Sequence, residues 1–224
     1  LRKLWNLLDR DVKIMKTFLV ASTLVVSSVA LAGNQASEPV GFFGDLGYSY
    51  RSGIESNDDQ STNGFSIGLG YTPTKYLELD VKSAFSTESF DSDEFFSFTD
   101  NDYDLSNTRL EFGGTGYYGF DELAGVYGRG ALGYNWLSTR EDSGYGSIEG
   151  GFYVKPMGSL SPTKVKVGYR YQDAFDSDVD YQSDAFVLSG EYEVLPGHSM
   201  TGSYEYSVGD VEFNGFNVSY RVRF

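Results

Sequence analysis

The decapeptide GFNVSYRVRF, residues 215–224, indicates the fold class most directly, because its side chains alternate strictly between two kinds. Aromatic and apolar residues occupy every second position, and polar or basic residues occupy the positions between them. Successive side chains of a β-strand point to opposite faces. The pattern therefore predicts a strand with one apolar face (Phe216, Val218, Tyr220, Val222, Phe224) and one polar face (Asn217, Ser219, Arg221, Arg223).

The same two-residue period recurs along the chain and predicts an all-β protein. Counting each alternating segment gives ten strands, although merging the glycine-rich fourth and fifth segments with their neighbours would leave eight. The segments are residues 41–51, 65–72, 77–85, 107–118, 126–136, 148–155, 164–171, 186–194, 200–208 and 215–224. An even number of strands brings both chain ends to the same side, which suits an antiparallel, up-and-down transmembrane β-barrel.

The connections between these segments fall into two classes. Four are short, and three of them contain the prolines Pro73, Pro156, Pro162 and Pro196, so we expect no proline inside a strand. The other five hold 19 acids and a single base, Arg140, and the longest, residues 86–104, also contains several aromatic residues. We expect the short connections to be periplasmic turns and the acidic ones to be extracellular loops.

The polar faces of the segments carry nearly balanced charge, whereas the apolar faces carry none. Because a buried ion without a partner costs several kcal/mol, this balance predicts a lumen filled by ion pairs. The expected network comprises Asp45, Arg51, Glu78, Asp80, Lys82, Arg109, Glu111, Arg129, Glu149, Lys155, Lys166, Arg170, Glu191, Glu205, Arg221 and Arg223.

The final strand, with its apolar residue at every second position and its terminal Phe224, resembles the closing strand of bacterial outer-membrane β-barrels. The pattern over residues 33–224 is similar to the small outer-membrane barrels of the OmpA and OmpX type, although those have eight strands. The resemblance implies a location in the outer membrane of a Gram-negative bacterium, in contact with lipid and lipopolysaccharide. It also implies that Phe216, Val218, Tyr220, Val222 and Phe224 form the signal that the barrel-assembly machinery reads.

The N-terminal part has the composition of an export signal. Met15 and Lys16 precede an apolar run that ends at Ala30-Leu31-Ala32, a small-residue cleavage site. We therefore expect a signal peptide at residues 15–32 and the barrel domain at residues 33–224. Residues 1–14 read as a non-native upstream segment, with an amphipathic leader as the rival interpretation.

Charge and residue usage exclude several classes of function. Removing the five bases and two acids of residues 1–32 from the 17 and 32 of the full chain leaves 12 bases and 30 acids, so we expect no nucleic-acid partner. The chain has no Cys and one His, His198, beside a predicted turn, so we expect no disulfide, no cofactor and no enzymatic activity. Asp176, Asp178 and Asp180 open like a calcium loop, but Tyr181 stands where that loop needs Gly. We therefore predict no metal site, while the acidic loops could hold divalent cations weakly.

Three readings of function remain open from the sequence. The first is a structural or surface-interaction protein whose lumen is closed by ion pairs and whose acidic loops contact partners. The second is a narrow channel, opened by inward glycines at positions 47, 68, 70, 133, 151 and 168 and made selective by the inward bases. The third is a soluble periplasmic sandwich or lipocalin-like barrel, whose apolar face would form an internal core.

Overall fold

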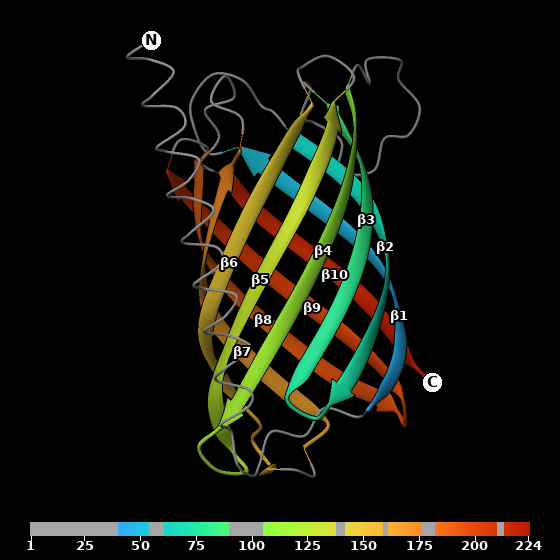
Figure 1. The fold of residues 1–224 in the computed structure, drawn as a ribbon, viewed down its shortest axis with the longest axis vertical. Helices are drawn as coiled ribbons and strands as arrows, with labels where there is room; N and C mark the ends of the chain where they lie inside the picture. Colours follow the sequence, from blue (N-terminus) through green and yellow to red (C-terminus); the bar gives the residue numbers. More distant parts are fainter. Residues whose placement is uncertain are drawn as a thin grey trace.

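The computed structural model describes residues 40–53, 61–89, 105–137, 142–158, 161–175, 182–209 and 213–224. Ten antiparallel strands form one closed barrel in which each strand pairs with its neighbours in sequence and the last pairs with the first (Figure 1). The predicted ten-strand, up-and-down barrel is confirmed, and the eight-strand alternative is wrong. The strands are β1 (Gly41–Gly53), β2 (Ser61–Thr74), β3 (Leu77–Ser89), β4 (Leu105–Gly119), β5 (Ala124–Leu137), β6 (Ser143–Val154), β7 (Thr163–Ala174), β8 (Gln182–Leu195), β9 (His198–Gly209) and β10 (Phe213–Arg223).

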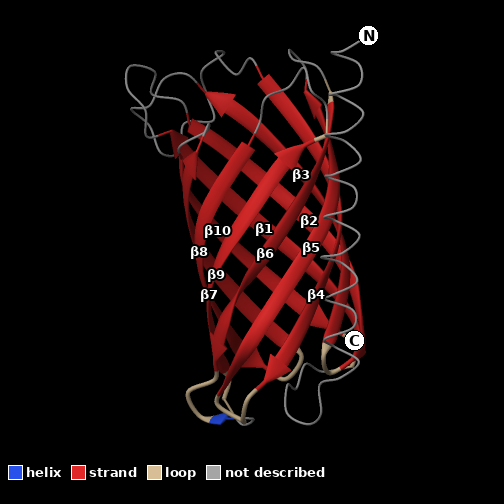
Figure 2. Ribbon diagram, turned by 60° about the vertical axis from the view of Figure 1, so that its left-hand side comes forward, coloured by secondary structure: helices blue, strands red, loops and turns tan. Residues whose placement is uncertain are grey.

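The strands are tilted against the long axis of the barrel, and they are longer than the sequence pattern predicted (Figure 2). β4, for example, has 15 residues, whereas 9 to 11 tilted residues suffice to cross a bilayer. Asp173 and Asp184, which were expected in an acidic loop, lie in β7 and β8. The extensions carry polar residues on both faces, so their alternation is lost although their ladder continues.

Pro73 corrects the expectation that no proline would interrupt a strand. It lies in β2, one residue before the end, and the pairing of β2 with β3 shifts register between Tyr71 and Thr74. A proline cannot donate a ladder hydrogen bond, so it is tolerated where an irregularity already breaks the ladder. The turn itself follows at Lys75 and Tyr76.

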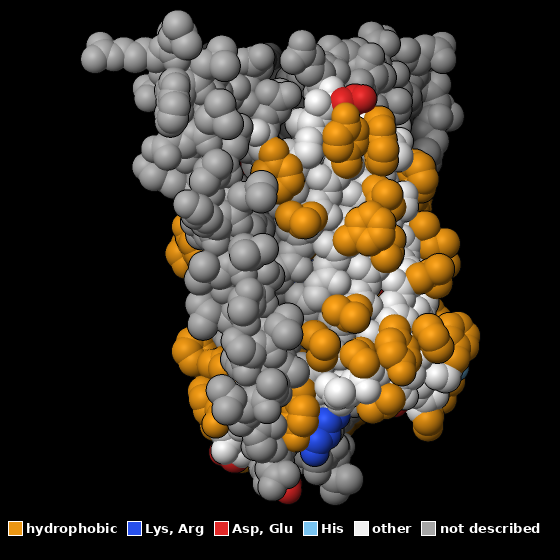
Figure 3. Space-filling view, in the orientation of Figure 1, with side chains coloured by type: hydrophobic (Ala, Val, Ile, Leu, Met, Phe, Trp, Pro, Cys, Tyr) orange, Lys and Arg blue, Asp and Glu red, His pale blue; other side chains and the backbone are white. Residues whose placement is uncertain are grey.

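The outward face of the barrel is apolar. Large hydrophobic side chains from all ten strands are exposed there, among them Leu69 at 67% and Leu188 at 50%. In the view of Figure 3, hydrophobic side chains cover the wall while charged ones gather near its two ends. A soluble barrel would hide this face, so the periplasmic sandwich or lipocalin alternative is wrong. Among the described residues, no helix is long and apolar enough to cross a membrane.

The inward face holds buried aromatic rings as well as charges. Phe43, Tyr117, Tyr145 and Tyr153 are each at most 3% exposed. These rings come from β1, β4 and β6, and they fill space in the lumen among the charged side chains. The predicted signal peptide with Ala30 and Ala32, most of the aromatic loop at residues 86–104, and the aspartates at 176, 178 and 180 lie outside the described residues.

Candidate functional site

The strands place the predicted charge network in the lumen, with one exception. All of its members except Lys155 are strand residues at inward positions, and those positions meet across the barrel. Lys155 follows the last residue of β6, and its backbone amide donates a hydrogen bond to the carbonyl of Leu123. The ladder ends there because Pro156 follows and has no backbone N–H to donate. Placing Lys155 on the strand was therefore wrong.

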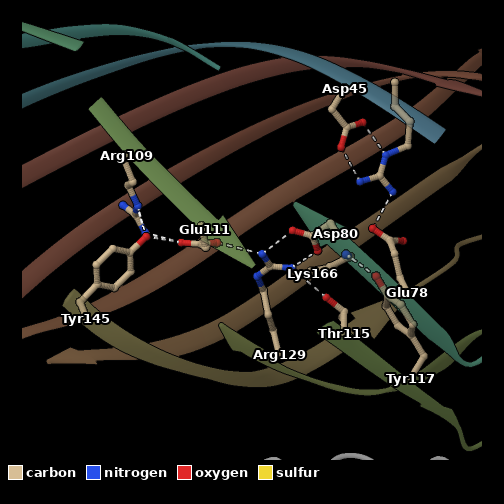
Figure 4. Close-up of polar contacts among 11 residues, drawn as sticks. Asp45, Glu78, Asp80, Arg109, Glu111, Thr115, Tyr117, Arg129, Tyr145 and Lys166 are labelled. Atoms are coloured by element: carbon tan, nitrogen blue, oxygen red, sulfur yellow. Dashed lines mark hydrogen bonds and ion pairs between the residues drawn. The ribbon is translucent and has the colours of Figure 1, made fainter. Parts of the chain in front are cut away.

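Arg129 forms the most extensively bonded cluster, close to the middle of the lumen (Figure 4). Its guanidinium makes two bonds to the Asp80 carboxylate, at 2.5 and 2.8 Å, and a third to Glu111 Oε1 at 2.9 Å. Glu111 Oε2 accepts from the Tyr145 hydroxyl at 2.7 Å and from Arg109. Both oxygens of Glu111 are therefore occupied by donors from three strands.

Arg221 forms a second cluster, which meets the first at β3, where Glu78 and Asp80 are neighbouring inward residues. Its guanidinium binds both oxygens of Asp45, at 2.7 and 2.9 Å, and reaches Glu78 Oε1 at 2.8 Å. The Phe43 ring lies 4.0 Å from the guanidinium carbon, close enough for a cation–π contact. Because Arg221 lies in β10, Asp45 in β1 and Glu78 in β3, these bonds join three strands through the lumen. The two-bond contact between the guanidinium and the Asp45 carboxylate also fixes their geometry more firmly than a single contact would.

Charges also pair at both ends of the lumen. Near the short turns, Glu191 contacts Lys164 Nζ at 3.0 Å and Arg223 at 3.2 Å. Near the acidic connections, at the opposite end, Glu205 pairs with Arg170 and lies 3.9 Å from Arg51. The lumen is thus bridged by ion pairs along its whole described length.

A tyrosine cluster closes the lumen toward the short turns. Tyr117 packs edge-on against Tyr153 and beside Tyr127, with ring centroids 5.9 and 6.5 Å apart. Lys166 Nζ donates to the Tyr117 hydroxyl at 2.9 Å and lies over the rings of Tyr117 and Tyr127. None of these three tyrosines was among the lumen residues predicted from the sequence. Their shared signal is an aromatic residue at an inward position with a glycine within two positions along the chain.

Four of the six inward glycines that were predicted to open a thread of water lie against neighbouring atoms. A side chain at Gly70 would overlap the Phe43 ring, one at Gly133 the Tyr145 ring, and one at Gly168 the Tyr127 hydroxyl. At Gly151 the added atom would meet the backbone carbonyl of Val167. At these four positions the space beside the glycine is therefore occupied by rings or backbone.

A cavity of about 220 Å³ lies in the lumen, in the half toward the acidic connections. Its lining includes the basic residues Lys82, Arg109 and Arg170. Small polar residues such as Ser49 and Ser66 line it as well. The cavity is therefore lined for polar contents rather than for a hydrophobic ligand.

The other candidate chemistry has little support in the geometry. His198 begins β9, and its Nδ1 lies 2.8 Å from the Tyr220 hydroxyl, with which it shares a hydrogen bond on an exposed rim. Within the described residues, no group of three or more His, Asp or Glu side chains is arranged to hold a metal ion. The predicted assembly-signal residues lie in β10 or, for Phe224, directly after it, and Phe224 is 80% exposed.

Comparison with known proteins supports the fold and goes no further. No protein-family model matches the sequence, and no curated protein matches it. The β domain of the Bordetella autotransporter BrkA superposes with a TM-score of 0.54 at 13% identity, over 84% of this chain and 100% of that one. An outer-membrane channel from Pseudomonas putida F1 superposes with a TM-score of 0.55 at 12% identity, over 86% and 98%.

Identities this low establish a shared fold and not a shared role. A closed antiparallel barrel with an apolar wall and a charged lumen is the architecture of outer-membrane β-barrels. The chain is a ten-stranded barrel of this class, located in the bacterial outer membrane.

Proposed function

We propose that the barrel is a closed membrane scaffold that holds its five acidic connections at the cell surface, where they contact lipopolysaccharide and other partners. The acidic connections are those that follow β1, β3, β5, β7 and β9. It has no catalytic role in this proposal. The observation that carries it is the filled lumen: the clusters around Arg129 and Arg221 and the ring of Tyr117 lie across the path that a solute would take. An eight-stranded barrel is just filled by its side chains, and two more strands add little room.

The residues of the five acidic connections support lipopolysaccharide as the partner. Residues 54–60, 90–104, 138–142, 175–181 and 210–212 are rich in Asp and Glu and contain one base, Arg140. All five follow the strands that run away from the chain ends, so they share one end of the barrel. Carboxylates can share a divalent cation with the phosphates of lipopolysaccharide, since both supply the oxygen ligands that Ca²⁺ and Mg²⁺ prefer.

Planar-bilayer conductance of the refolded protein tests the closed lumen, with heat-dependent gel migration showing that the barrel has formed. We expect a folded barrel that carries no current. Discrete current steps whose ion preference changes with Arg170→Glu would overturn the closed-lumen proposal and make the protein a channel.

Binding of labelled lipopolysaccharide to the barrel in micelles tests the surface role. We expect Ca²⁺-dependent binding that weakens several-fold when Asp91, Asp93 and Glu94 are replaced by their amides. Glu122→Gln, in the short turn between β4 and β5, is the matched control because it removes an exposed acid at the opposite end. Equal weakening of lipopolysaccharide binding by Glu122→Gln, or binding that does not depend on Ca²⁺, would contradict the proposed contact.

A narrow channel is the second candidate, and the cavity beside Arg170 favours it. The matched Pseudomonas putida structure is that of a channel. For this chain, conduction would require the rings of Phe43 and Tyr117 to leave their present positions.

A further inference from the structure

The cavity in the lumen has an excess of positive charge. Five of the described side chains that line it are basic, namely Arg51, Lys82, Arg109, Arg129 and Arg170. Three are acidic, namely Glu111, Glu149 and Glu205. Asp80 adds one carboxylate from outside the lining by binding Arg129. With Asp80 counted, the bases that line the cavity outnumber these acids by one.

Lys82 carries this excess. Among the described residues, no carboxylate lies within ion-pair distance of its ammonium. The charged groups that act on it from the surrounding strands are Glu111 and Asp45, which attract it, and Arg109 and Arg129, which repel it. Lys82 is therefore a half-buried cation held between two others.

The strand register explains why Lys82 has no partner. On one side it pairs with Gly68, which has no side chain, and on the other with Glu111. Both Glu111 oxygens are already taken by Arg129, Arg109 and Tyr145. Asp45 in β1 is the partner of Gly68 on its other side, and both of its carboxylate oxygens accept hydrogen bonds from the Arg221 guanidinium. The two nearest carboxylates are thus committed to guanidinium groups.

Arg170 brings more positive charge to the same cavity. It pairs with Glu205, Glu149 and Glu111 attract its charge, and Arg51 and Arg109 oppose it. Ser66 and Ser147 also line the cavity, and their hydroxyls can donate hydrogen bonds. The hydroxyl of Ser49, a third lining serine, donates to the Gly64 carbonyl at 3.5 Å. Cations combined with small hydroxyl donors are the chemistry that recognises an anion with several oxygens.

We propose that this cavity binds a small oxyanion of the phosphate class, with the Lys82 ammonium as its principal charge partner and Arg170 and the serine hydroxyls completing its contacts. A volume of about 220 Å³ accommodates such an ion together with several waters. A lipid phosphate does not fit this description, because the cavity lies inside the lumen and a lipid would bring its chains with it. The ligand is therefore a free solute anion, and the inference holds whether or not the barrel conducts.

Isothermal titration of the refolded barrel with inorganic phosphate tests the proposal, at constant ionic strength maintained with chloride. We expect saturable binding of one phosphate. Lys82→Gln should weaken it about tenfold, since it removes a hydrogen bond between two charged groups. Lys82→Arg keeps the charge and should stay within a few-fold of the unaltered protein.

Lys75→Gln is the matched control, because Lys75 is an exposed lysine in the turn between β2 and β3. It should bind phosphate as the unaltered barrel does. The Lys82→Gln barrel should fold at least as well as the unaltered one, as judged by heat-dependent gel migration, since it loses a cation without an ion-pair partner. The proposal is overturned if the folded, unaltered barrel takes up no phosphate, or if Lys82→Gln and Lys75→Gln bind it equally.

Discussion

The ring of Phe43 lies against Gly70, its partner across the β1–β2 pair, and covers the place where a side chain at residue 70 would begin. Phe43 is 1% exposed although it belongs to the face that carries Asp45 and Arg51. A large ring on a polar lumen wall is thus accommodated by a glycine on the neighbouring strand. This pairing of an aromatic with a glycine recurs at Tyr145 with Gly133.

Gly70→Ala should therefore destabilise the barrel. Inserting a methyl group into a filled space typically costs about 1–3 kcal/mol, and the Phe43 ring leaves no room for it. Urea titration of the barrel in lipid vesicles measures the loss. Gly190→Ala is the control, because a methyl group there meets no atom within 4 Å. Recovery of stability in the double variant Gly70→Ala, Phe43→Leu would tie the cost to the ring, whereas equal costs at both glycines would refute it.

Leu188→Arg should impair folding into lipid. Leu188 lies in the middle of β8 and is 50% exposed on the apolar wall, where a basic side chain costs about 2–4 kcal/mol at the midplane of the bilayer. The folded fraction in vesicles, read from gel migration before and after heating, reports the effect. Leu188→Phe keeps the residue apolar and should fold normally; a folded fraction that is the same for both variants would mean that this face does not meet lipid.

Removing the Arg129 side chain should be costly because its partners stay behind. Arg129→Met leaves Asp80 without its guanidinium, and breaking a buried pair in this way typically costs about 3–5 kcal/mol. Adding Asp80→Asn to that variant should restore part of the loss. A double-mutant cycle on unfolding free energies gives the coupling, and additive losses would show that the two side chains do not interact in the folded barrel.

The faces and the number of strands could be predicted from the sequence because a closed barrel imposes its period on every strand. Ile67 and Leu69 alternate with Ser66 and Gly68, and each pair lies on the expected sides of β2. The ends of the strands could not be predicted. Beyond the membrane both faces are wet, so alternation stops while the hydrogen-bonded ladder continues to residues such as Ser89 and Asp173.

The ring-filled part of the lumen was missed for a different reason. Alternation was read from polarity. The period puts Phe43 on the face of Asp45, but Phe43 is as apolar as Phe42, so nothing in its residue type indicated that its ring packs against Arg221 in the lumen. Tyr117 is ambiguous in the same way, because its ring suits a packed interior and its hydroxyl suits a charged one. The three hydrogen bonds that Glu111 accepts, from Arg109, Arg129 and Tyr145, depend on the registers of several strands together, which no single segment specifies.

The Arg221 fork has a consequence for the order of events during biogenesis. It joins Asp45 to a base 176 residues later in the chain, and it is also the guanidinium that reaches Glu78. Until β10 docks onto β1, the carboxylates of Asp45 and Glu78 lack the guanidinium that they share in the closed barrel. Contacts this distant in sequence form slowly. A sheet that closed without β10 would therefore bury two acids without this partner, which opposes closure of a shorter barrel.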